Sequence, residues 1–152
     1  MKLMENYHDN IVNKCVMERI SFVWRSDNIL HYQVSEDAHI TMDDINASLE
    51  VVKGWGKDNK YLHLFQAGHN SSVDNEVREW AASPDQNQFT IADAILVRDR
   101  AQRLIANFYV RFNNPIKPTK VFTSQSEAIN WLNEQGSIYS KANPNWHKQT
   151  IK

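Results

Sequence analysis

The chain has 152 residues, of which 41% are hydrophobic and 23% are charged. A chain of this length usually forms one domain, and this composition excludes a fibre or a disordered chain. The 17 basic and 18 acidic residues give a net charge of −1, which argues against a dedicated nucleic-acid-binding protein. The single cysteine, Cys15, cannot form an intramolecular disulfide, so we expect a reducing, cytoplasmic environment.

Targeting and membrane-spanning segments are not evident in the sequence. Residues 1–19 mix charged and apolar side chains and lack the continuous apolar run of a signal peptide. The longest apolar stretch, residues 91–97, contains Asp93 and is much shorter than the roughly 18 residues of a membrane helix. We therefore expect a cytoplasmic protein without a membrane span, in which residues 1–17 form an extension before the domain.

The first elements are predicted to be a β-hairpin and a helix. Residues 20–24 and 29–34 are rich in β-branched and aromatic side chains and flank a polar turn, as in a hairpin. Thr41 is a suitable helix cap, and apolar residues follow it at three- and four-residue steps. This pattern predicts a helix that ends at the glycines of positions 54 and 56.

A strand and a short helix are predicted next. Residues 61–65 form a short, largely apolar and aromatic stretch that is typical of a strand. Ser71 or Ser72 can cap a helix that extends to residue 81 and ends before Pro84. The change of period from two to about 3.6 indicates a strand-to-helix unit.

The second half continues this alternation. Residues 90–97 are predicted to form a strand buried on both faces, at the centre of the sheet. A helical stripe follows over residues 101–112, then a short strand at 120–122. A capping box opens a last helix over residues 124–136. Residues 137–152 are polar and are expected to form a loosely docked tail.

This order of elements predicts one α/β domain over residues 18–136. We expect a mixed, mostly parallel sheet of about five strands with an N-terminal β-hairpin, covered by about four helices. The helices should contribute apolar side chains to the core. These side chains are Ile45, Leu49, Val52, Leu104, Ile105, Phe108, Ile129 and Leu132.

Motifs for enzymatic chemistry are absent from the sequence. Its four glycines form neither a dinucleotide-binding nor a phosphate-binding loop, and no G-x-S-x-G nucleophile motif occurs. The six histidines show no metal-ligand spacing, and paired carboxylates such as Asp43 and Asp44 are typical of a helix start. We therefore expect no cofactor, no metal and no enzymatic activity.

Charge is distributed unevenly along the chain. Residues 98–120 carry a net charge of +5, whereas residues 36–50 carry −5. Within the basic segment, arginines recur on one side of the predicted helix or just before it: Arg98, Arg100, Arg103 and Arg111. They form either a solvated helix face or a surface for an anion or an acidic partner, with Arg98 near a strand end where open α/β sheets usually bind ligands.

The sequence resembles a known family in several stretches. These are residues 95–108, 112–123 and 128–132, together with the order of the elements. They resemble an uncharacterised bacterial family of STAS-like domains, related in fold to the anti-sigma-factor antagonists and to sheet-and-helix lipid-binding modules. The resemblance covers roughly residues 18–135.

The resemblance implies a non-enzymatic regulatory module that acts through protein contacts. In anti-sigma-factor antagonists a phosphorylatable serine lies at the start of the helix after the third strand, and Ser71 and Ser72 match that position. Helix capping by either serine is the alternative. A second hypothesis is a carrier or sensor of a small anionic or amphipathic ligand, held between helices and sheet near Arg98. An enclosed apolar cavity would favour the carrier, whereas a solid core with an exposed helical patch would favour the interaction module.

Self-association is a further expectation. A two-fold homodimer could place the basic residues 98–111 of each copy against the acidic residues 36–50 of the other. Such a dimer would be weak and would dissociate as salt screens its contacts. A monomer with ordinary charge scatter is the alternative.

Overall fold

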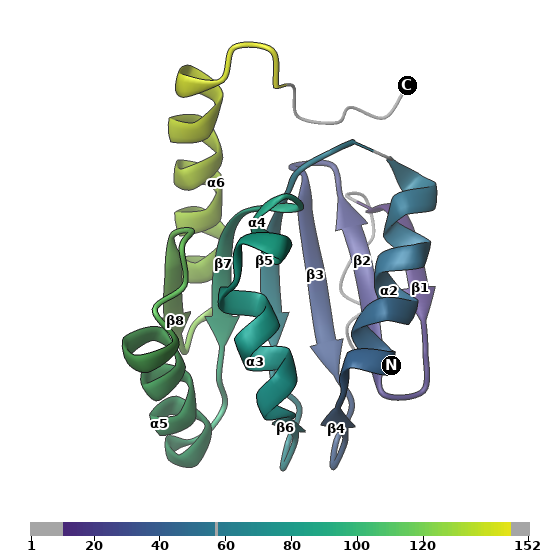
Figure 1. The fold of residues 1–152 in the computed structure, drawn as a ribbon, viewed down its shortest axis with the longest axis vertical. Coiled ribbons are helices and arrows are strands. Elements are labelled where there is room, and N and C mark those ends of the chain that lie inside the picture. Colours follow the sequence, from purple (N-terminus) through teal and green to yellow (C-terminus); the bar gives the residue numbers. More distant parts are fainter. Residues whose placement is uncertain (1–10, 57, 147–152) are drawn as a thin grey trace.

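The computed structural model describes residues 11–56 and 58–146. A mixed six-stranded sheet with the strand order β1-β2-β3-β5-β7-β8 forms its centre (Figure 1). Strand β2 is antiparallel to both of its neighbours, β1 and β3. The strands β3, β5, β7 and β8 are parallel to one another. The strands are β1 (Ile11–Val16), β2 (Ile20–Arg25), β3 (Ile29–Val34), β5 (Tyr61–Gln66), β7 (Thr90–Leu96) and β8 (Thr119–Phe122).

Helices lie on both faces of this sheet. Figure 1 shows α2 and α3 in front of the strands, α6 behind them and α5 beside the edge strand β8. The helices are α2 (Met42–Trp55), α3 (Asn75–Ala82), α4 (Pro84–Asn87), α5 (Arg100–Phe108), the π-helix η1 (Tyr109–Asn113) and α6 (Gln125–Ala142). The expected mixed, mostly parallel sheet with an N-terminal hairpin is thus confirmed.

The sheet has one more strand than we predicted. Residues 11–16 lie in the segment expected to be an extension, but they pair with β2 as the edge strand β1. A shift in register between Ile11 and Asn13 interrupts the alternation of apolar and polar side chains, which explains why the pattern was missed. The prediction for β7 also needs correction, because this strand is internal but β3 and β5 occupy the centre.

Two helix boundaries differ from the prediction. Helix α3 begins at Asn75, because Ser72–Val73 forms the short strand β6, which pairs with β4 (His39–Ile40). Neither Ser71 nor Ser72 therefore caps this helix. The last helix continues through the buried Gly136 to Ala142, so the first residues of the expected tail are helical. Residues 1–10 and 147–152 lie outside the described residues.

The hydrophobic core consists of one cluster on each face of the sheet. On the first face, Ile45 and Val52 of α2 pack with Val77 of α3 against β2, β3 and β5. On the second face, Ala128 and Leu132 of α6 are fully buried against β5, β7 and β8. The predicted burial of Ile45, Val52 and Leu132 is therefore confirmed, whereas Leu49 and Ile129 are half-buried.

Helix α5 contradicts the predicted core. Leu104 is 66% exposed, Ile105 55% and Phe108 57%, although their spacing predicted burial. The helix instead turns Ala106 and the following Tyr109 toward the protein. An apolar stripe in the sequence identifies one face of a helix, but it does not show which other element covers that face. The side of α5 that packs against the rest of the domain also contains small and polar side chains.

Candidate ligand pocket

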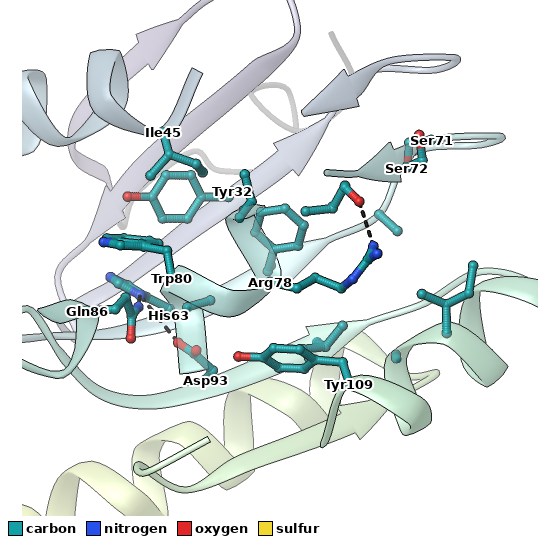
Figure 2. A pocket seen from close by; sticks show the side chains of 18 of the residues that line it. Tyr32, Ile45, His63, Ser71, Ser72, Arg78, Trp80, Gln86, Asp93 and Tyr109 are labelled. Carbon is teal, nitrogen blue, oxygen red and sulfur yellow. Dashed lines mark hydrogen bonds and ion pairs between the residues drawn. The ribbon is translucent and has the colours of Figure 1, made fainter. Parts of the chain in front are cut away.

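A pocket of about 210 Å³ lies between the first face of the sheet and the helices α2, α3 and α5 (Figure 2). Its walls are mainly apolar, because side chains of both the strands and the three helices point into it. They include Ile45, Phe65, Val77, Trp80, Ile95 and Ile105. Apolar walls with a few polar groups are typical of small-molecule sites.

The inner end of the pocket contains a group of half-buried and buried charged and polar side chains. His63 of β5 and Asp93 of β7 face each other across the parallel strand pair, with 3.4 Å between His63 Nδ1 and Asp93 Oδ1. The other carboxylate oxygen of Asp93 lies 3.2 Å from Nζ of Lys117. This ammonium group also donates to the carbonyl of Ala81. The carboxylate of Asp93 is therefore charge-compensated inside the protein.

Two buried polar atoms of the pocket have no hydrogen-bond partner within residues 11–56 and 58–146. They are Gln86 Oε1 and the hydroxyl oxygen of Tyr109, whose residues are only 4% and 6% exposed. The amide nitrogen of Gln86 donates to Thr90 Oγ1 at 2.6 Å, which fixes its side chain beside His63. An unpaired buried polar atom is costly, so each position favours a ligand that supplies the missing hydrogen bond.

The Tyr109 hydroxyl is held in its neutral form. Burial raises its pKa above the usual value, and the negative charge of Asp93 adds to this effect. A neutral phenol can both donate and accept a hydrogen bond. Figure 2 shows this ring beside Asp93, with its hydroxyl pointing toward that carboxylate, so the polar groups converge at one end of the pocket.

The outer end of the pocket has a second polar group. Arg78 of α3 lines it and donates to the carbonyl of Val73 at 2.6 Å. Ser71 donates to the carbonyl of Gly68 at 2.8 Å, and Ser72 lies 2.7 Å from His39 Nδ1. Figure 2 shows both serines at the end opposite the His63–Asp93 pair.

At the outer end of the pocket, the loop after β5 packs so closely against the end of β3 that position 68 has room only for glycine. A Cβ atom at this position would lie 2.2 Å from the carbonyl oxygen of Val34, far inside contact distance. Its carbonyl also accepts from Gln102 Nε2 at 2.7 Å, which ties the start of α5 to this loop. A side chain at Gly68 would therefore move the loop that borders the pocket.

Of the six site residues proposed from the sequence, the structure places only the two serines at the pocket. Ser71 and Ser72 line the pocket, whereas the four arginines Arg98, Arg100, Arg103 and Arg111 are exposed and do not. The pocket is near the end of β7, and Arg78 is the arginine that lines it. Nothing in the structure tests phosphorylation, which stays a prediction. In the part of the chain that is described, no cluster of three or more His, Cys, Asp or Glu side chains suits a metal ion.

Sequence reasoning missed the polar inner end. In the sequence, Asp93 is evident only as an interruption of an apolar run. That interruption was the available signal, because a carboxylate within a buried strand must be paired. Its partners, His63 and Lys117, come from two other segments of the chain, and only the parallel pairing of β5, β7 and β8 brings them together.

The sheet order, the N-terminal hairpin and the two helical layers define a mixed α/β domain. A model of the domain of unknown function DUF7793 matches residues 23–135, and the chain belongs to this family. No curated protein matches the sequence. None of the helices described here is long and apolar enough to cross a membrane.

Two solved structures are similar to the chain. One is an uncharacterized protein of the DUF3478 family from Shewanella loihica PV-4, described as having a SpoIIAA-like fold. It is 12% identical, with a TM-score of 0.49 over 84% of this chain and 96% of that one. The other is a protein of unknown function from Arthrobacter sp. FB24, which is 24% identical with a TM-score of 0.25 over 73% of this chain and 90% of that one.

Proposed function

We propose that this protein is a non-enzymatic binding module that holds a small amphipathic molecule in the pocket. One observation carries the proposal: the lining of an apolar pocket includes Gln86 and Tyr109, and the Oε1 atom of the one and the hydroxyl oxygen of the other lack partners among the described residues. A protein that needed only a solid core would gain stability by filling this space.

The geometry favours a ligand with an apolar body and an uncharged polar group. A cavity of about 150 Å³ is large enough for benzene, so about 210 Å³ accommodates a somewhat larger molecule. A hydroxyl or amide group can donate to Gln86 and exchange a hydrogen bond with Tyr109. A carboxylate fits less well at this end, because Asp93 lines the pocket, whereas Lys117, which compensates its charge, does not.

Octan-1-ol and octanoate test this proposal, because they share a chain length and differ in the polar group. We expect saturable one-to-one binding of octan-1-ol in calorimetric titration. Octanoate should bind at least about tenfold more weakly, which corresponds to about 1.4 kcal/mol. Absence of saturable binding by either probe would contradict a ligand pocket.

Two neighbouring alanines of α3 provide a blocking variant and its control. Ala81 lines the pocket and Ala82 does not, although both are half-buried. The substitution Ala81→Leu should abolish octan-1-ol binding by occupying the space, whereas Ala82→Leu should leave it unchanged. Equal effects of the two substitutions would show that the probe binds elsewhere.

A regulatory role through protein contacts is a second candidate. The exposed Ser72 at the outer end of the pocket favours it, because its hydroxyl is accessible and close to the pocket lining. A phosphate on Ser72 would add negative charge near Arg78 and so link modification to ligand entry. Intact-mass measurement of the native protein under several growth conditions tests this candidate, and the absence of any phosphorylated species would oppose it.

A further inference from the structure

The largest exposed apolar surface of the described residues lies on α5 and the segment after it. Among all the described residues, seven large hydrophobic side chains are exposed, and five of these seven lie between residues 104 and 116. We call these five the α5 face: Leu104, Ile105, Phe108, Phe112 and Ile116. The rings of Phe108 and Phe112 stack with their centroids 4.3 Å apart, so part of this face is continuous.

Positive charge borders the α5 face. Arg100 and Arg103 are exposed on the flank of α5 beside Leu104, at 3.6 residues per turn. Arg111 follows in η1, where its guanidinium lies 5.6 Å from the centre of the Phe112 ring. None of the three forms an ion pair within the described part of the chain. A helix with bulky apolar residues on one side and arginines on the other is typical of segments that lie in the headgroup region of an anionic bilayer.

The α5 face also adjoins the pocket. Ile105 lines the pocket and is 55% exposed, so one side chain belongs to both surfaces. Helix α5 lies at the β8 edge of the sheet, with its outer side turned away from the other helices (Figure 1). Such a projecting surface suits a flat partner.

A second copy of the chain fits this face poorly. In a symmetric pair of α5 faces the arginines of both copies would lie close together and repel. The acidic segment, residues 36–50, offers charge but not apolar surface, because its exposed side chains are mostly polar. It also lies on the β1–β3 side of the sheet in Figure 1, remote from α5.

We propose that the α5 face docks on an anionic lipid membrane without spanning it. The apolar side chains enter the boundary between headgroups and acyl chains, and the arginines contact the anionic headgroups. This surface is independent of the proposed pocket ligand, although their closeness would let an amphipathic molecule pass between membrane and pocket.

Flotation with lipid vesicles tests the proposal on the full chain. We expect binding to vesicles of equal parts phosphatidylcholine and phosphatidylglycerol, and at least about tenfold weaker binding to phosphatidylcholine alone. Raising the salt concentration from about 0.1 M to about 1 M should weaken the binding. Failure to bind anionic vesicles would overturn the proposal and favour an acidic protein surface as the partner.

Vesicle binding by variants with substitutions at exposed positions tests whether the α5 face, and not another surface, contacts the membrane. The double variant Phe108→Ser and Phe112→Ser should lose vesicle binding, and Arg103→Gln should weaken it roughly fivefold. Ile138→Ser and Lys141→Gln, on exposed positions of α6, are the matched controls and should bind like the parent. Unchanged binding of the double variant would overturn the proposal, as would loss of binding in the controls.

Two further measurements make the outcome unambiguous. Circular dichroism should show the same thermal midpoint for every variant, because all the substituted side chains are exposed. Sedimentation velocity also tests the expected weak homodimer: a dimer that Phe108→Ser dissociates would assign the face to self-association and overturn membrane docking. Octan-1-ol titration in solution reports on the pocket separately, so either proposal can fail alone.

Discussion

The two faces of the six-stranded sheet are covered in different ways. On one face the single long helix α6 packs closely, and Leu132 is fully buried against Leu62 and Leu64. On the other face α2, α3 and α5 share the cover, and a pocket of about 210 Å³ remains between them. The first face therefore contributes mainly packing, whereas the second combines packing with room for a ligand.

The contrast between a closely packed face and a face with a pocket is also seen in two histidines on the neighbouring strands β3 and β5. His31 of β3 is fully buried on the α6 face, with its Nε2 2.8 Å from Gln66 Oε1. Burial lowers its pKa to about 4; the hydrogen bond to Gln66 opposes this shift and the charge of Arg25 adds to it. His63 of β5 faces the pocket, beside the carboxylate of Asp93. One imidazole is thus enclosed in the core, whereas the other borders a polar site.

A leucine from each face should give the largest contrast in stability. We expect Leu132→Ala to lower the free energy of unfolding by about 3–5 kcal/mol, because it opens a cavity in a closely packed region. Leu49→Ala should cost less than about half as much, since Leu49 is half-buried and borders space that already exists. Urea unfolding measures both losses. Equal losses would show that the two faces are packed alike.

The pH dependence of stability should report on His31. The folded state holds this imidazole neutral down to a pKa of about 4, whereas the unfolded chain binds the proton near 6.5. The unfolded state therefore binds more protons between these values, so stability falls as the pH is lowered from about 6.5 to 4. We expect a loss of up to about 3 kcal/mol from this group.

Urea midpoints at neutral and acidic pH test this expectation. The variant His31→Gln should lose less stability than the parent as the pH falls. His69→Gln, at an exposed loop position, should follow the parent. A parent-like slope in His31→Gln would mean that other groups cause the acid sensitivity.

Phenylalanine substitutions should separate α5 from the core. Phe108→Ala should cost less than about 1 kcal/mol, because the side chain is already 57% exposed. Phe122→Ala, at a buried position of β8 on the α6 face, should cost about 3–5 kcal/mol. The sequence alone predicted that Phe108 is buried, and a buried Phe108 would give the larger value. A measured loss of that size in urea unfolding would contradict the exposed α5 face.

Local sequence patterns predicted most of the helices and strands, but they did not predict which face of each element packs against the rest of the domain. The short apolar run of residues 61–65 and the cap at Thr41 involve neighbours in sequence, so they are visible without the fold. The orientation of Phe108 depends on which surface lies next to α5, and that surface is built by distant strands. The bulged strand β1 and the partners of Asp93 were missed for the same reason, because they depend on pairing between segments far apart in the chain.

The substitution Tyr109→Phe tests the ligand pocket most directly, because it removes only a buried hydroxyl that has no partner among the described residues. We expect the free energy of unfolding to stay the same or to rise by up to about 1 kcal/mol, since no hydrogen bond is lost. The affinity for octan-1-ol should fall about fivefold or more, because the polar group of the probe loses a contact. A clear loss of stability with unchanged octan-1-ol affinity would contradict the assignment, because the hydroxyl would then serve the fold and not a ligand.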